Sequence, residues 1–139
     1  MIESIDVAIL TMNSDRMLRE CINSVYQNVP VNNLIIVDGC STDATADIVK
    51  EFQEKYGNIQ FAQKKGTRGS ARQTAIQMVK SDWFMFVDSD VILSKNWLAE
   101  AEKLVKDGVG AIWGIEIWSV LKGSKLLKLF ERLTLKIFE

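Results

Sequence analysis

Short runs rich in apolar residues alternate along this chain with longer stretches in which apolar residues recur at helical spacing. The short runs occupy residues 5–11, 34–37, 58–62, 83–87 and 108–118. A strand that is apolar along its whole length is buried on both faces, and a helix between two such strands is the crossover of a parallel sheet. We therefore predict an α/β fold of the Rossmann-like type: three layers, αβα, around a mainly parallel sheet.

Between the predicted strands, the apolar spacing indicates helices with recognisable ends. Ser14 or Asp15 is placed to cap the first helix, which contains residues 17–25. The second helix begins near Asp43, and Gly57 stands where its C-terminal stop belongs. Further helices are predicted at about residues 70–79, 97–105 and 122–138.

Charge is distributed unevenly along the chain. Residues 1–120 carry 12 basic and 16 acidic side chains, whereas residues 121–139 carry five basic and two acidic ones. The body has no basic patch of the kind that binds nucleic acid, so we expect no nucleic-acid partner. The last stretch is predicted to form a helix with lysines along one side. Such a helix can rest on an anionic membrane, cover the sheet, or pair with a second copy of the chain.

Smaller signals bear on location and oligomeric state. Cys21 and Cys40 form no CxxC pair, and no apolar run reaches the roughly 18 residues that a membrane span needs. The N-terminus is acidic and leads directly into a strand, unlike a signal peptide. We expect a cytoplasmic protein, with the basic tail offering contact to the cytoplasmic face of a membrane. Apolar surface left exposed by the sheet would favour association, so we also predict a homodimer.

Four polar segments follow the predicted strands: residues 11–13, 38–43, 64–69 and 88–90. In parallel sheets, ligands bind beyond the carboxyl ends of the strands, where these four segments would meet. The sequence therefore predicts one ligand-binding edge built from all four.

Asp88 and Asp90 end a strand that contains three aromatic residues. Two carboxylates at such a position repel each other unless a cation joins them. The chain has no histidine, so a metal site must use oxygen ligands, which favours Mg²⁺ or Mn²⁺ together with substrate phosphates. The alternative is a turn in which an aspartate caps the next helix.

The other segments suggest a nucleotide. Asp38 could accept hydrogen bonds from a nucleoside, although this segment could equally cap the following helix. The basic, glycine-rich residues 64–72 could approach a diphosphate or form a solvated loop. Arg72 is predicted in the first turn of a helix, where a cation opposes the helix dipole, so an anionic partner is expected. Thr11 could contact the nucleoside through its backbone, while Asn13 more simply hydrogen-bonds its turn.

Taken together and in order, five segments resemble the family-2 inverting glycosyltransferases of the GT-A fold. They are VAILTMN (7–13), RECINSV (19–25), IVDGCSTDAT (36–45), GSARQ (69–73) and VDSD (87–90). The resemblance implies a UDP- or GDP-sugar donor, a divalent cation (Mg²⁺ or Mn²⁺) and a single displacement at the anomeric carbon. It also implies a nucleotide-sugar-binding domain over residues 1–118, followed by residues 119–139 as part of an acceptor region.

By carry-over from the family, Asp90 is the metal ligand, and Asp88 lies by the ribose or the water shell of the metal. The remaining substrate-binding residues implied in this way are Thr11, Asn13, Asp38, Gly39, Arg72 and Ser89.

The chain also departs from the family pattern. Gly39 replaces an aspartate that often contacts the base, and Met12 replaces a tyrosine. No acidic residue after Asp90 lies in the motif of a catalytic base, which inverting transfer requires, and Glu116 is the one that we would test. We therefore expect a fold truncated after its donor-binding half and inactive alone. The alternative is a non-catalytic module that binds a nucleotide-sugar or a partner chain. A dehydrogenase is disfavoured because no GxGxxG follows the first strand.

Overall fold

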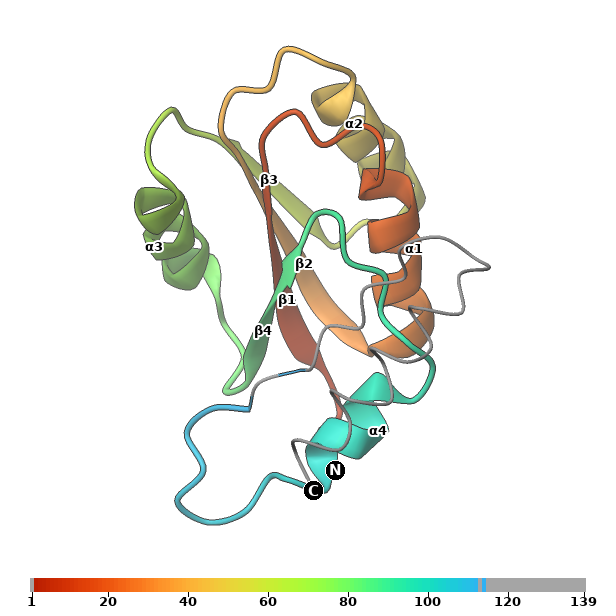
Figure 1. Cartoon of the computed structure of the whole chain (residues 1–139), viewed down its shortest axis with the longest axis vertical. Helices are drawn as coiled ribbons and strands as arrows, with labels where there is room; N and C mark the ends of the chain where they lie inside the picture. Colours follow the sequence, from red (N-terminus) through yellow and green to blue (C-terminus); the bar gives the residue numbers. More distant parts are fainter. Residues whose placement is uncertain (1, 113, 115–139) are drawn as a thin grey trace, which may run out of the picture. The chain divides into compact units, whose positions relative to one another are not determined.

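The computed structural model of the chain describes residues 2–112 and 114, and within them a four-stranded parallel sheet (Figure 1). The strand order is β3-β2-β1-β4. Strands and helices alternate as β1 (Ile5–Thr11), α1 (Leu18–Asn28), β2 (Val31–Asp38), α2 (Thr45–Lys55), β3 (Ile59–Gln63), α3 (Arg68–Met78), β4 (Phe84–Asp88) and α4 (Trp97–Glu102). The three-layer α/β fold predicted from the apolar runs is confirmed.

Helices cover both faces of the sheet (Figure 1). Helices α1 and α2 pack on one face, where the core consists of Val7, Ile9, Leu34, Ile36 and Val87 from the strands and Leu18, Ile22, Val25, Ile48, Val49 and Phe52 from the helices. Helix α3 packs on the other face through Ala75, against Ala8, Ile35 and Val37. Burial of each large apolar side chain stabilises the fold by about 1.5–3 kcal/mol relative to exposure.

The register of the sheet aligns the carboxyl ends of its strands. Thr11 pairs with Asp38, Asp38 pairs with Gln63, and Leu10 pairs with Asp88. All these pairs are parallel. The loops that follow the strand ends, at Thr11, Asp38, Gln63 and Asp88, therefore emerge at one edge of the sheet (Figure 1). The fold therefore gathers the predicted ligand segments, although they are far apart in the sequence.

Helix boundaries differ from the sequence-based predictions. Helix α1 begins at Leu18 after Met17, and neither Ser14 nor Asp15 caps it with a side chain. The Ser14 side chain is bonded elsewhere, and its carbonyl oxygen instead accepts from the Leu18 N–H at 3.2 Å. Helix α2 ends at Lys55, and Tyr56, which follows it, is extended, so Gly57 supplies no left-handed stop.

Helix α3 begins earlier than predicted. Thr67 caps it by accepting from the Ser70 N–H, so the first helical residue is Arg68. Arg72 is consequently the fifth residue of the helix and lies beyond the first turn. The argument that Arg72 opposes the helix dipole therefore applies better to Arg68.

The region after β4 also departs from the prediction. Helix α4 ends at Glu102, because residues 103–105 form tight turns, with the Leu104 N–H donating to the Ala101 carbonyl. Residues 108–112 form no strand: Gly108 turns the chain with φ +85°. The rest of the predicted fifth strand (residues 113 and 115–118) and the predicted helix 122–138 lie outside the described residues.

The chain divides into two compact units, Met1–Val109 and Gly110–Glu139. The first contains the whole described sheet. The predicted domain boundary at residues 118–119 lies outside the described residues and stays a prediction. Within the described part, no helix combines the length and the apolar character needed to cross a bilayer.

Candidate functional site

Asp38 is a fully buried carboxylate at the ligand edge, with no exposed surface. Its Oδ1 accepts from the Thr11 hydroxyl at 2.8 Å and from the Ser41 hydroxyl. Its Oδ2 accepts from the Ser41 N–H at 2.8 Å and from Gln63 Nε2 at 3.1 Å. Burial by itself raises the pKa of this carboxyl, but the donors from Ser41, Gln63 and Thr11 outweigh burial and lower the pKa below its ordinary value. Asp38 is therefore an ionised residue that organises the ends of three strands.

Asn13 joins the loop after β1 to the loop after β2. Its N–H donates to the Ser41 hydroxyl at 2.8 Å, and its Oδ1 accepts from the Thr42 N–H at 2.9 Å. Asn13 and Cys40 both have a positive φ, 50° and 66°, which is the left-handed conformation that asparagine tolerates well. The two loops are thus tied into one surface before any ligand arrives.

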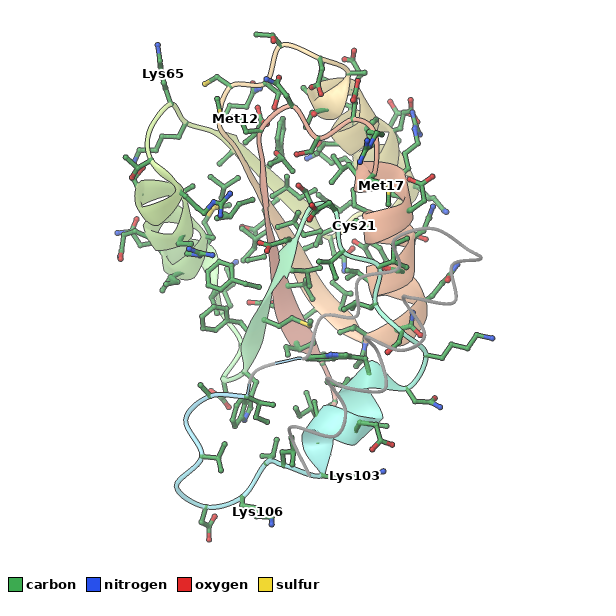
Figure 2. The ribbon with its side chains drawn as sticks, viewed as in Figure 1. Met12, Met17, Cys21, Lys65, Lys103 and Lys106 are labelled. Atoms are coloured by element: carbon green, nitrogen blue, oxygen red, sulfur yellow. The ribbon has the colours of Figure 1, made fainter. Side chains whose placement is uncertain are left out.

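The two departures from the family pattern meet in space. The Gly39 N–H donates to the Thr11 carbonyl at 2.8 Å, which brings residue 39 against the turn after β1. A Cβ at position 39 would lie 3.3 Å from Met12 Sδ, closer than ordinary van der Waals contact. Met12 is 68% exposed, and Figure 2 shows it at the carboxyl edge of the sheet. Glycine at 39 and methionine at 12 therefore fit each other.

A basic loop connects β3 to α3. Its first residue is pinned, because the Lys64 N–H donates to the Asp38 carbonyl at 2.9 Å. Lys64, Lys65 and Arg68 are exposed, and Figure 2 shows the Lys65 side chain pointing away from the sheet. Arg72 is also exposed, and its guanidinium lies 5.8 Å from the centre of the Phe86 ring. Within the described residues, these four cations form no ion pair.

Asp88 and Asp90 flank a tight turn at the end of β4. The Val91 N–H donates to the Asp88 carbonyl at 3.0 Å, and the buried Cys21 thiol contacts the same carbonyl at 3.5 Å. Both aspartates are exposed. Burial, together with the negative charge of Asp90 and Asp88, raises the pKa of Cys21 to about 12. The thiol beneath the turn (Figure 2) is therefore protonated and can donate to that carbonyl.

The carboxylates of this turn fit a divalent cation. Among the described residues, none donates a hydrogen bond to either carboxylate, and no Lys or Arg pairs with them. The described part of the chain also contains no group of three or more Asp, Glu, Cys or His side chains able to enclose a metal. A metal held here would therefore need phosphate oxygens and water to complete its shell, as Mg²⁺ sites usually do.

The acidic residues of α4, Glu100 and Glu102, lie away from this edge (Figure 1). Glu102 accepts from the Ile2 N–H at 2.6 Å, next to the start of β1 at the opposite end of the sheet. Glu100 pairs with Lys103 on the same helix. Glu116, Glu131 and Glu139 lie outside the described residues.

Sequence reasoning missed several residues that build the edge. Gln63 was not singled out, yet it donates to Asp38. Ser14 is one of the two predicted caps of the first helix, but its hydroxyl lies 2.9 Å from that of Ser89. Thr45 has no exposed surface and accepts from the Ser14 N–H at 2.8 Å. Their only sequence signal is a polar side chain next to a strand end or helix start.

A parallel αβα fold with polar residues at the carboxyl edge of the sheet defines a Rossmann-like protein. The sequence model described as Glycosyl transferase family 2 matches residues 6–122, and the chain belongs to that family. The resemblance drawn from the five segments is therefore confirmed.

Named relatives agree with this family. Poly(ribitol-phosphate) beta-glucosyltransferase of Bacillus spizizenii is 35% identical over 92 residues, which cover 62% of this chain and 14% of that protein. Poly(ribitol-phosphate) beta-N-acetylglucosaminyltransferase TarS of Staphylococcus aureus is 31% identical over 107 residues, covering 73% of this chain and 18% of that protein. The chain thus spans less than a fifth of the length of these two relatives.

Solved structures agree on the GT-A fold. The crystal structure of S. aureus TarS 1–349 in complex with UDP has a TM-score of 0.63 at 25% identity, and the match covers 81% of this chain and 38% of that one. Mannosyltransferase PcManGT from Pyrobaculum calidifontis, in complex with GDP-Man and Mn²⁺, has a TM-score of 0.68 at 23% identity, covering 76% and 33%. At 23% identity, the likeness to PcManGT shows the fold alone.

Proposed function

We propose that this chain binds a UDP- or GDP-sugar together with Mg²⁺ or Mn²⁺, as the donor domain of an inverting glycosyltransferase. The observation that carries the proposal is the turn at Asp88 and Asp90: two exposed carboxylates without a cation partner among the described residues. The TarS structure that contains UDP supports the same type of ligand.

In this proposal, Asp90 is the metal ligand, and Asp88 lies by the ribose or the water shell of the metal. The bound cation would supply positive charge to the diphosphate, which is the leaving group of sugar transfer. Asp88 and Asp90 would keep that charge at the end of β4. Because the described residues offer no third ligand, the affinity for the metal alone would be low and would rise with the diphosphate.

Asp38 and Thr11 would shape the nucleoside site without contacting the base through their side chains. All four hydrogen bonds to Asp38 come from the chain itself, so its carboxylate has little capacity left for a base. We propose that Asp38 shapes the loop at Gly39, whose backbone faces the base beside Met12. With no side chain at residue 39, recognition of the base would rest on neighbouring groups.

The diphosphate would lie between the metal turn and the start of α3. Backbone N–H groups at the start of a helix favour anions, and Arg68 and Arg72 add full positive charges there. Arg72 lies over Phe86 of β4, which keeps its guanidinium close to the strand that ends at Asp88.

Calorimetric titration with UDP and GDP, with and without Mn²⁺, tests the proposal. We expect Mn²⁺-dependent binding of at least one diphosphate and a loss of tenfold or more in affinity for Asp90→Ala. Asp82→Ala is the matched control, because Asp82 is an exposed carboxylate before the other end of β4. Absence of binding by the folded wild-type chain, or equal affinity in Asp90→Ala, would contradict the proposed site.

Inverting transfer itself requires a base that deprotonates the acceptor. The alternative function, a non-catalytic binding module, is favoured by the position of Glu100 and Glu102 away from the ligand edge. Incubation of the chain with a bound UDP-sugar tests the non-catalytic alternative. Release of sugar by hydrolysis or transfer would exclude the non-catalytic module, whereas an intact donor is expected for either function, because the donor domain is expected to be inactive alone.

A further inference from the structure

Ser14 joins three segments of the ligand edge through both its backbone and its side chain. It lies in the turn between β1 and α1 and is half-buried. Its N–H donates to Thr45 Oγ1 at 2.8 Å, and Thr45 is the fully buried first residue of α2. Its hydroxyl accepts from the Met12 N–H at 3.2 Å and lies 2.9 Å from the hydroxyl of Ser89.

These contacts hold the Ser14 hydroxyl in a defined place. The bond to Thr45 fixes the backbone from the side of α2, and the bond from Met12 fixes the side chain from the side of β1. A hydroxyl has one proton and two lone pairs, so the Ser14 hydroxyl can accept from Met12 and still donate to Ser89. The turn after β1 is therefore a fixed support for the residue between the two aspartates.

Ser89 connects Ser14 to the turn that follows β4. The Asp88 carbonyl is held by the Val91 N–H and the Cys21 thiol, and the Ser89 hydroxyl is held by Ser14. The carboxylates of Asp88 and Asp90, in contrast, receive no hydrogen bond from the described residues and are exposed. The turn is thus anchored through its backbone and its middle residue, while its two charges stay available.

We infer that Ser14 and Ser89 are positioning residues: their hydroxyl pair fixes the Asp88–Asp90 turn in the orientation that binds the metal-diphosphate. This inference rests on the proposed function for its ligand. It assigns Ser89 a contact with Ser14 in place of the direct substrate contact expected from the sequence. A hydrogen bond between neutral groups contributes about 0.5–1.5 kcal/mol, so its loss is expected to change affinity roughly 2- to 10-fold.

The test uses Ser14→Ala, Ser89→Ala and the double variant of the 139-residue chain. Ser81→Ala is the matched control: the Ser81 hydroxyl accepts from the Asp6 N–H and donates to the Trp83 carbonyl, just before the opposite end of β4. Amide hydrogen exchange at residues 88–91 without ligand is measured first. Calorimetry with UDP, in the presence and absence of Mn²⁺, follows.

We expect faster exchange at residues 88–91 in both single variants and a 2- to 10-fold weaker Mn²⁺-dependent affinity for UDP. Binding without Mn²⁺ should not change, and the double variant should match the singles, because both substitutions remove one contact. Ser81→Ala should lower stability without either effect.

Unchanged exchange in Ser14→Ala would overturn the inference. Additive losses of affinity in the double variant would also overturn it, because Ser89 would then contact the ligand itself. A wild-type chain that binds no UDP would contradict the proposed function, and the exchange measurement would still decide whether the hydroxyl pair fixes the turn.

Discussion

A carboxylate buried at the end of a strand is costly unless its oxygens are hydrogen-bonded, and Asp38 illustrates the requirement. Thr11, Ser41 and Gln63 together supply four donors, and these donors come from three different segments of the chain. The same residue therefore stabilises the fold and arranges the loops of the proposed nucleoside site.

Asp38→Asn should lower the free energy of unfolding by about 1–3 kcal/mol, because its NH₂ group would face donors that now meet an oxygen. Urea denaturation monitored by circular dichroism measures the change. Asp47→Asn is the control, since Asp47 is exposed on α2 and should change stability by no more than about 0.5 kcal/mol. Equal stabilities of the two variants would contradict the structural role of Asp38.

At the scale of elements, the start of α3 depends on one capping residue. Thr67 is extended, with φ −86° and ψ 163°, and its side chain accepts from the Ser70 N–H. The same helix start faces the proposed diphosphate, so its order matters for binding as well as for folding.

Thr67→Ala should destabilise the protein by about 0.5–2 kcal/mol, because it leaves the Ser70 N–H without its cap. Thr67→Ser keeps the hydroxyl and should recover most of this loss. Thermal unfolding of the two variants beside the wild type measures both changes. If serine and alanine at position 67 give the same midpoint, the cap does not contribute.

The amino end of the sheet is organised by a second buried carboxylate, which the sequence reasoning did not single out. Asp6 has no exposed surface and accepts from the backbone N–H groups of Lys80 (2.6 Å) and Ser81 (3.1 Å) and from the Asn32 amide (2.8 Å). It also accepts from Asn33. Through Asp6, β1 is tied to the start of β2 and to the turn that leads into β4.

For the whole molecule, Asp6 and Asp38 set how stability responds to acid. Burial raises the pKa of Asp6, but its backbone and amide donors outweigh burial, so its pKa lies below the ordinary value of 3.8, as for Asp38. The unfolded chain then binds more protons in this range, so stability is fully present above about pH 4–5 and is lost as pH falls through the folded pKa values.

Urea denaturation between pH 6 and pH 2.5 should therefore show a steep decrease in the free energy of unfolding below about pH 4. The Asp6→Asn variant should start from a lower stability and show a shallower decrease, because one of the carboxyls with a lowered pKa is gone. An unchanged slope in this variant would mean that Asp6 does not contribute to the acid response.

The predicted homodimer remains a prediction at this scale. Ile76 of α3 and Phe86 of β4 are 44% and 37% exposed, which leaves apolar surface on the described part of the chain. Light scattering across a wide concentration range should give the mass of a dimer, and a monomer throughout would refute the prediction. The predicted membrane contact falls on residues outside those described.

Most of the described helices and strands follow from the local sequence, because period and polarity are local properties. Apolar runs predicted β1 to β4, and strand-end polar residues predicted the edge that carries Asp38, Asp88 and Asp90. The order of five short segments indicated the family that the match over residues 6–122 confirmed. The predictions were wrong where a polar side chain could form hydrogen bonds with more than one partner, as for the caps of α1 and α3.

The hydrogen-bond partners depend on the folded chain, because these bonds join residues far apart in the sequence. Ser14 and Ser89 are 75 positions apart, as are Asp6 and Ser81. Whether a serine caps its own helix or supports a distant turn depends on which acceptor the folded chain brings within about 3 Å. The local sequence does not specify that distance. The register of the parallel sheet does, because it sets which strand ends and loops lie next to each other.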